Sequence, residues 1–181
     1  FRRVLFRSQD VIDGQNEEGA FSCCAPLVFG GTPADPVCSS FLVAGYQALL
    51  HMGNLSVIKY AYDRFAAWEE LLLSKSEDYI VNYSYYGDWA GPAYACVGED
   101  GALSSVTPGI LMSTGYSYFN ASLLSSLAEK LGRDDKAAHY GSIAAKVKKA
   151  FLDKWYNPET AFVAEGSQAS QAFALWLDIL P

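Results

Sequence analysis

The chain has 181 residues, 51% of them hydrophobic and 18% charged, which is enough length and apolar content for a folded domain with its own core. Its formal charge of −7 argues against nucleic acid as a partner, because binding to a phosphate backbone requires a clustered basic surface. No run of residues approaches the roughly 18 apolar positions of a membrane-spanning helix, so we expect no membrane partner.

The aromatic content of 14%, led by 12 Tyr, suits a ligand surface that combines ring stacking with hydrogen bonds, as a neutral carbohydrate requires. The adjacent Cys23 and Cys24 are poorly placed for a mutual disulfide, and neither they nor Cys38 and Cys96 have the spacing of metal ligands. We therefore expect reduced thiols, no metal ion and no cofactor, which favours a cytoplasmic location.

Apolar residues recur at helical spacing in five segments, which predict helices over residues 36–52, 55–75, 108–131, 133–155 and 168–180. Pro36 and Pro108 suit a first helical turn, and Thr107 is a favoured type of N-cap residue. Gly53 and Gly132 suit the left-handed position that ends a helix. The first two pairs of helices therefore form hairpins with tight glycine corners.

The segments between the hairpins have a different character. Residues 76–105 interrupt the helical periodicity with several glycines, which predicts a long ordered loop, and Phe162–Val163 predicts a short strand. Residues 1–8, FRRVLFRS, do not continue the pattern that starts at Gln9 and contain no signal-peptide core. We interpret them as a foreign tail and place the domain at residues 9–181.

The unit of helix, glycine corner and helix occurs twice, and the spacing of its corners exceeds the roughly 33 to 47 residues of common helical-repeat arrays. In stacked antiparallel hairpins the short corners share one end, so the long segments 9–35, 76–106 and 156–167 share the other. This pattern predicts an all-α fold, an incomplete α/α toroid of antiparallel helical hairpins with long loops on one face. We expect the functional site on that face.

The densest group of candidate binding residues lies in the loop after the first hairpin. Aromatic rings stack on pyranose rings and a carboxylate accepts hydrogen bonds from adjacent hydroxyls, so rings around one carboxylate indicate a neutral sugar ligand. The alternative is that these rings only pack the loop onto the helices. The group comprises Tyr79, Tyr83, Tyr85, Tyr86, Asp88, Trp89 and Tyr94.

Glycoside hydrolysis requires two carboxyl groups, and the other carboxylates of this face are better explained structurally. Asp35 suits a helix N-cap, Glu99 and Asp100 a solvated turn, and Glu165 a loop tip. The other polar candidates also have structural explanations. His51 lies near a helix C-terminus, where the helix dipole favours it, and His139 lies on a polar helix face. Gln168 and Gln171 can cap the last helix.

Several landmarks follow one another along the chain: DVIDGQNEEGAF at 10–21, YGDW at 86–89, AEKLGRDDKAAHY at 128–140 and GSQASQAFAL at 166–175. In this order and spacing they resemble the catalytic domain of bacterial α-L-rhamnosidases, a six-hairpin (α/α)6 toroid. The resemblance implies an inverting hydrolase that releases terminal α-L-rhamnose. It also implies a glutamic general acid before Asp10 and a glutamate base beyond Pro181, and therefore no catalytic residue within this chain.

The resemblance also implies the substrate-binding residues. Trp89 matches the loop tryptophan that lines the family's rhamnose pocket, and Asp88 stands beside it. Tyr86 and Asp35 complete the predicted set, although this chain has Thr-Pro-Ala before Asp35 where the family often has a tryptophan.

Two alternatives stay open. Another six-hairpin glycosidase is one, since this architecture hosts several sugar specificities, and a non-catalytic helical scaffold that binds glycan or protein is the other. We expect the sequence to be a piece of a longer domain, because its last helix has no partner. An incomplete ring predicts exposed apolar side chains on that helix, including Leu175, Trp176 and Ile179.

Overall fold

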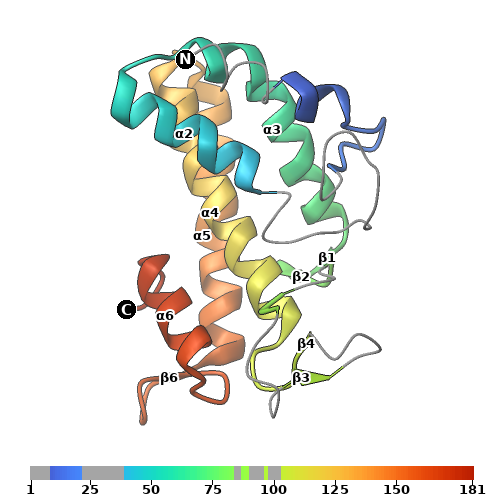
Figure 1. The fold of residues 1–181 in the computed structure, drawn as a ribbon. Coiled ribbons are helices and arrows are strands. Elements are labelled where there is room, and N and C mark those ends of the chain that lie inside the picture. Colours follow the sequence, from blue (N-terminus) through green and yellow to red (C-terminus); the bar gives the residue numbers. More distant parts are fainter. Residues whose placement is uncertain (1–8, 22–38, 84–86, 90–95, 98–102) are drawn as a thin grey trace.

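The computed structural model describes residues 9–21, 39–83, 87–89, 96–97 and 103–181 (Figure 1). After a helical segment at residues 9–13, the described chain contains the predicted helices in the predicted order. They are α2 (Ser40–Met52), α3 (Ser56–Ser74), α4 (Gly109–Lys130), α5 (Asp134–Trp155) and α6 (Gln168–Trp176). The all-α class predicted from the apolar periodicity is therefore confirmed.

Two glycine corners form the tight ends of the hairpins α2–α3 and α4–α5. Gly53 and Gly132 have φ angles of 62° and 69°, a left-handed conformation that costs residues with a Cβ about 1–2 kcal/mol. The Gly53 N–H donates to the Leu49 carbonyl at 2.9 Å, which closes the last turn of α2. Figure 1 shows both corners at the same end of the molecule, as the hairpin argument predicts.

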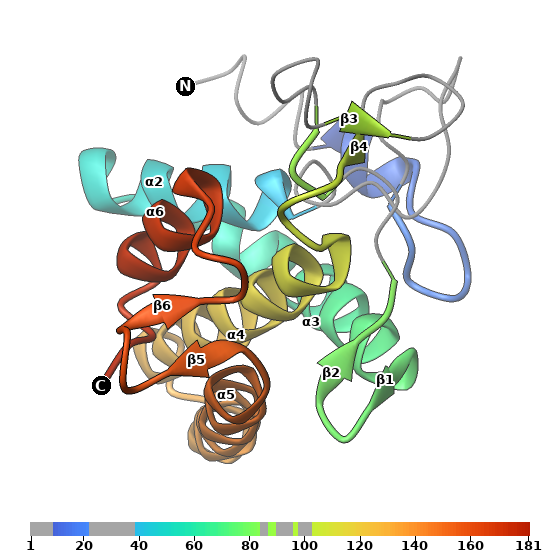
Figure 2. The same cartoon turned by 90° about the horizontal axis from the view of Figure 1, so that it is seen from below.

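Three short antiparallel strand pairs follow or precede the helix ends remote from the corners. Figure 2 shows them arranged around the first turn of α4, at the end that we call the long-loop rim. The pairs are β1 (Ser76–Glu77) with β2 (Ile80–Val81), β3 (Cys96–Val97) with β4 (Leu103–Ser104), and β5 (Tyr156–Asn157) with β6 (Phe162–Val163).

Helix α4 is the central element, because it contacts α3, α5, α6 and β2. One apolar cluster joins α2, α3 and the corner halves of α4 and α5, and includes Tyr62, Trp68 and Leu124. A second cluster joins the rim halves of α4 and α5 with β6 and α6, and includes Phe151 and Phe173. We call the layer formed by α2 to α6 the wall. Since α4 contributes to both clusters, it connects the end of the wall with the glycine corners to the long-loop rim.

Close packing of α6 on α4 depends on Gly115. A Cβ at this position would lie 2.3 Å from the Phe173 ring and 2.9 Å from Leu177, distances at which neighbouring groups must move. The absence of a side chain therefore lets the two helices approach each other.

The structure corrects three expected details. The N-cap of α4 is Pro108, whose extended ψ of 135° precedes the helix, and the Thr107 hydroxyl instead pairs with Ser167. Helix α6 ends at Trp176 rather than Leu180, because the chain turns at Asp178 (φ 52°). This turn buries Ile179 in the second cluster, so the prediction that Ile179 is exposed was wrong. The predicted helix start at Pro36 lies outside the described residues.

Candidate functional site

The loop that carries the predicted binding residues is fastened to α4 where it begins. The buried hydroxyl of Ser113 donates to the Val81 carbonyl at 2.5 Å, and the Val81 N–H donates to the buried hydroxyl of Thr114 at 3.0 Å. Hydrogen bonds to both the N–H and the carbonyl of one residue fix the position and the direction of β2. The chain therefore leaves the wall toward the rim along a defined path.

Asp88 and Trp89 lie beyond this clamp, after Gly87, which is buried and has a φ of 54°. The Asp88 carbonyl accepts a hydrogen bond from the Ser104 N–H at 3.2 Å, so this short segment runs beside β4. The Trp89 side chain is 56% exposed. Asp88, the preceding residue, is partly exposed. A half-exposed indole can stack on a sugar ring, and a carboxylate can accept hydrogen bonds from sugar hydroxyls.

The structure thus describes two of the four predicted binding residues, Asp88 and Trp89, and places both beside β4. Tyr86 and Asp35 lie outside the described residues. The same applies to other residues discussed from the sequence, namely residues 1–8, Cys23, Cys24, Cys38, Tyr85, Tyr94, Glu99 and Asp100, and to the side chain of Cys96.

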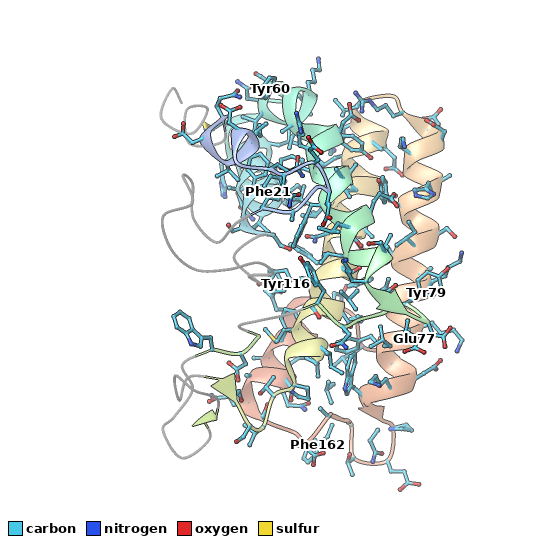
Figure 3. The ribbon with its side chains drawn as sticks, turned by 90° about the vertical axis from the view of Figure 1, so that its right-hand side faces the viewer. Phe21, Tyr60, Glu77, Tyr79, Tyr116 and Phe162 are labelled. Atoms are coloured by element: carbon cyan, nitrogen blue, oxygen red, sulfur yellow. The ribbon has the colours of Figure 1, made fainter. Side chains whose placement is uncertain are left out.

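Two members of the predicted aromatic group pack against the wall instead of joining Trp89. Tyr79 lies at the tip of the β1–β2 hairpin and points toward α5, where the Lys146 ammonium is 5.4 Å from its ring (Figure 3). Tyr83 packs on the first apolar cluster with Lys75 5.8 Å from its ring. For these two residues the packing interpretation holds.

The start of α6 is capped by Ser167 rather than by a glutamine. The Ser167 hydroxyl accepts from the Ser170 N–H at 3.1 Å, and the Gln171 amide donates to the Val163 carbonyl at 3.1 Å. Glu165 is exposed in the loop, as expected of a loop tip. The prediction that Gln168 and Gln171 cap this helix was therefore wrong: Ser167 is the cap, and Gln171 instead ties the first turn of α6 to β6.

Phe162 is a rim residue that sequence reasoning left out of the candidate site. It lies in β6 with 53% of its surface exposed, and Figure 3 shows it at the rim end of the molecule. Alternation in this strand buries Val163 and turns Phe162 outward, which is the signal that identifies it. The rim therefore offers a second exposed ring.

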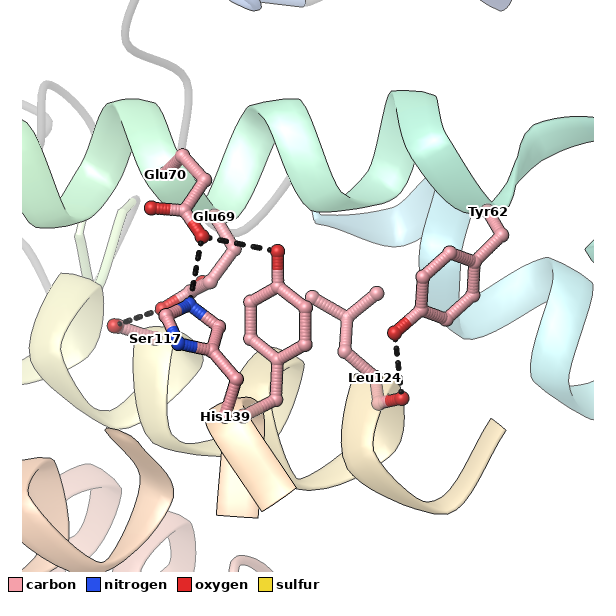
Figure 4. A network of polar contacts seen from close by, with 7 residues as sticks. Tyr62, Glu69, Glu70, Ser117, Leu124 and His139 are labelled. Atoms are coloured by element: carbon pink, nitrogen blue, oxygen red, sulfur yellow. Dashed lines mark hydrogen bonds and ion pairs between the residues drawn. The ribbon is translucent and has the colours of Figure 1, made fainter. Parts of the chain in front are cut away.

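A polar network between α3, α4 and α5 also went unpredicted (Figure 4). Glu69, which is fully buried, accepts a hydrogen bond from the Ser117 hydroxyl. The next residue, Glu70, accepts from the Tyr140 hydroxyl at 3.0 Å and pairs with His139 at 3.2 Å. Burial, followed by the Glu70 charge and hydrogen bond, raises the pKa of Tyr140, which therefore stays a neutral donor.

His139 and Glu70 also line a groove of about 470 Å³ between α3, α5 and the β1–β2 hairpin, together with Asp78 and Lys146. Within this groove the Glu70 carboxylate is already bonded to two side chains of α5, Tyr140 and His139. We therefore assign the His139–Glu70 pair to the packing of α5 on α3.

Within the described ranges, no three His, Cys, Asp or Glu side chains are grouped closely enough to hold a metal ion. Among the helices described, none combines the length and the apolar character needed to cross a lipid bilayer.

Antiparallel helical hairpins with a common loop rim define an α/α-toroid type of wall. Residues 5–181 match the model of the bacterial α-L-rhamnosidase six-hairpin glycosidase domain. The chain belongs to this family.

Comparisons with individual proteins agree with this assignment. The chain is 22% identical over 173 residues to an α-L-rhamnosidase of Formosa agariphila, covering 95% of this chain and 18% of that protein. It superposes on the α-L-rhamnosidase of Dictyoglumus thermophilum with a TM-score of 0.84 and 27% identity, covering 97% of this chain and 20% of the other. The α-L-rhamnosidase of Streptomyces avermitilis in complex with L-rhamnose shares the fold, with a TM-score of 0.81, 24% identity and coverage of 99% and 16%. The chain thus spans about a fifth of these relatives.

Proposed function

We propose that this chain forms a sugar-contacting section of the wall of an α-L-rhamnosidase that hydrolyses terminal α-L-rhamnosides with inversion. The general acid and the general base are residues of the longer protein that lie outside these 181 residues. Within it, Trp89 stacks on the sugar and the Asp88 carboxylate accepts hydroxyl hydrogen bonds. Tyr86 and Asp35 supply further contacts.

The observation that carries this proposal is the half-exposed indole of Trp89 beside Asp88 on the long-loop rim. Membership of a six-hairpin glycosidase family supports a carbohydrate as the ligand, and the names of the similar proteins, one of them bound to L-rhamnose, support rhamnose as the sugar. Indole surface in water and a neighbouring acceptor are the groups that a neutral sugar requires.

The test is hydrolysis of an aryl α-L-rhamnoside by the full-length protein that contains this chain, against a panel of other aryl glycosides. We expect release from the rhamnoside, with the inverted anomer as the first product seen by NMR. Trp89→Ala should reduce kcat/KM by about 10- to 100-fold, because covering the exposed indole face with a sugar ring contributes about 1.5–3 kcal/mol.

Tyr60→Ala is the matched control, since Tyr60 is also exposed, at 59%, but lies in α3 at the end of the molecule opposite the long-loop rim (Figure 3). Its kcat/KM should stay within about twofold of the wild type. Release from a different glycoside would contradict the rhamnoside assignment. Equal losses in the Trp89 and Tyr60 variants would contradict the role of Trp89.

A further inference from the structure

A continuous series of hydrogen bonds leads from Asp88 to the start of α6. The Ser104 N–H donates to the Asp88 carbonyl at 3.2 Å, and the Ser104 hydroxyl accepts from the Thr107 N–H at 3.1 Å. The Thr107 hydroxyl then meets the Ser167 hydroxyl at 2.7 Å. The last contact joins residues that are far apart in the sequence, one before α4 and the other at the N-cap of α6.

The α6 end of this series is firmly held. Besides capping α6, the Ser167 hydroxyl bonds to the Ser170 hydroxyl at 3.0 Å, which also donates to the Val163 carbonyl at 3.0 Å. Ser170 is fully buried and Thr107 is 1% exposed. The Thr107 hydroxyl therefore attaches the loop to a rigid and largely dry part of the wall.

We propose that Thr107 is a positioning residue for the sugar site, because its hydrogen bond to Ser167 fixes the segment of Asp88 and Trp89 relative to α6. This inference rests on the proposed function, in which Trp89 contacts the sugar. Thr107 itself touches no substrate; it acts through Ser104 and the main chain of Asp88. Its loss lowers sugar affinity and leaves the chemical step alone.

The contacts separate this role from a role in folding. In a Thr107→Val variant the Ser167 hydroxyl keeps both of its contacts with Ser170, so the cap of α6 and the Ser167 oxygen remain satisfied. Valine has nearly the shape of threonine and fills the same buried space. The Val81 clamp on α4 is untouched. The variant therefore detaches Ser104 and the Asp88 main chain from α6 without opening the core.

The experiment compares Thr107→Val and Thr107→Ser in the full-length protein with an aryl α-L-rhamnoside as substrate. We expect Thr107→Val to raise KM about three- to tenfold, the range that one neutral hydrogen bond provides, with kcat within about twofold of the wild type. Thr107→Ser should restore KM because it keeps the hydroxyl. Thr160→Val is the control: its hydroxyl accepts only from the Phe162 N–H among the described contacts, in the β5–β6 turn, and KM should not change.

Acrylamide quenching of the 181-residue chain gives a second readout that needs no sugar. In a Trp176→Phe background Trp89 is the principal exposed tryptophan among the described residues, since Trp68 and Trp155 are buried. Thr107→Val should increase quenching of Trp89, and Thr107→Ser should not. Absence of rhamnoside turnover by the wild type would count against the proposed function, while the quenching comparison still decides the positioning. Unchanged KM and unchanged quenching in Thr107→Val, or a fall in kcat alone, would overturn the inference.

Discussion

Tyr62 shows at the scale of one residue how the wall is held together near its corners. Its hydroxyl donates to the Leu124 carbonyl of α4 at 3.1 Å, and the Arg133 guanidinium lies 4.9 Å from its ring centre. Arg133 is held there by an ion pair with Asp63 at 2.8 Å. Burial raises the pKa of Tyr62 to about 12, against the opposing effect of Arg133.

This pKa predicts a loss of stability in alkali. The unfolded chain ionises Tyr62 near pH 10, whereas the folded chain keeps it neutral to about pH 12. Its contribution is therefore complete below about pH 10 and is lost as the pH rises through about 12. Tyr62→Phe should cost about 1 kcal/mol of unfolding free energy at neutral pH and should flatten the alkaline decline.

Urea unfolding followed by circular dichroism at a series of pH values measures both effects. In Tyr62→Phe the unfolding free energy still falls somewhat in alkali because of Tyr140, whose pKa is also raised by burial and by Glu70. Tyr60→Phe is the control, because Tyr60 lies on the same helix and is exposed (Figure 3). Parallel declines of wild type and Tyr62→Phe would contradict the prediction.

At the scale of elements, the sequence predicts some helices better than others for a physical reason. Helices α3 and α5 present one apolar stripe to the core, and residues 58, 62, 65, 68 and 72 of the predicted α3 stripe are all buried. Helix α4 is surrounded on several sides, so buried Ser113, Ser117 and Asn120 are mixed with its apolar residues. Pro108 and Gly132 at its ends predict that the helix exists. The elements that it contacts could not be predicted from its sequence.

The same distinction applies to the candidate site. The corners at Gly53 and Gly132 predict which end carries the loops, and so place Asp88 and Trp89 on the long-loop rim. The clamp on Val81 and the pair of Thr107 with Ser167 depend on residues brought together only by folding, and no local pattern encodes them.

Gly115 supplies a prediction about the contact of α4 with α6. Alanine in a helix interior is ordinarily about 1 kcal/mol better than glycine, yet here a Cβ meets the Phe173 ring at 2.3 Å. Gly115→Ala should therefore destabilise the chain by about 1–3 kcal/mol and accelerate amide exchange in α6. In α5, Gly141→Ala meets only the Ser125 hydroxyl, at 3.2 Å, and should cost much less. Equal effects at the two glycines would refute the steric explanation.

The whole molecule exposes apolar surface on α6. Leu175 and Trp176 are 68% and 54% exposed, and Trp176 extends an aromatic surface with Phe119, whose ring centre is 4.6 Å away. Adjacent exposed apolar groups favour association. We predict that the isolated chain associates with increasing concentration, and that Leu175→Asp shifts it toward the monomer in sedimentation experiments. Leu50→Asp, at an exposed position of α2, should have little effect. A wild-type chain that stays monomeric at all concentrations would contradict this prediction.

The connection between the two hairpins is fastened at both ends, at Val81 to α4 and at Thr107 to the cap of α6. All the groups that make these two fastenings lie outside residues 82–106. The amino acids at positions 82–106 can therefore change without removing either fastening. We predict that exchanging residues 82–106 for those of a relative leaves the helical frame in place.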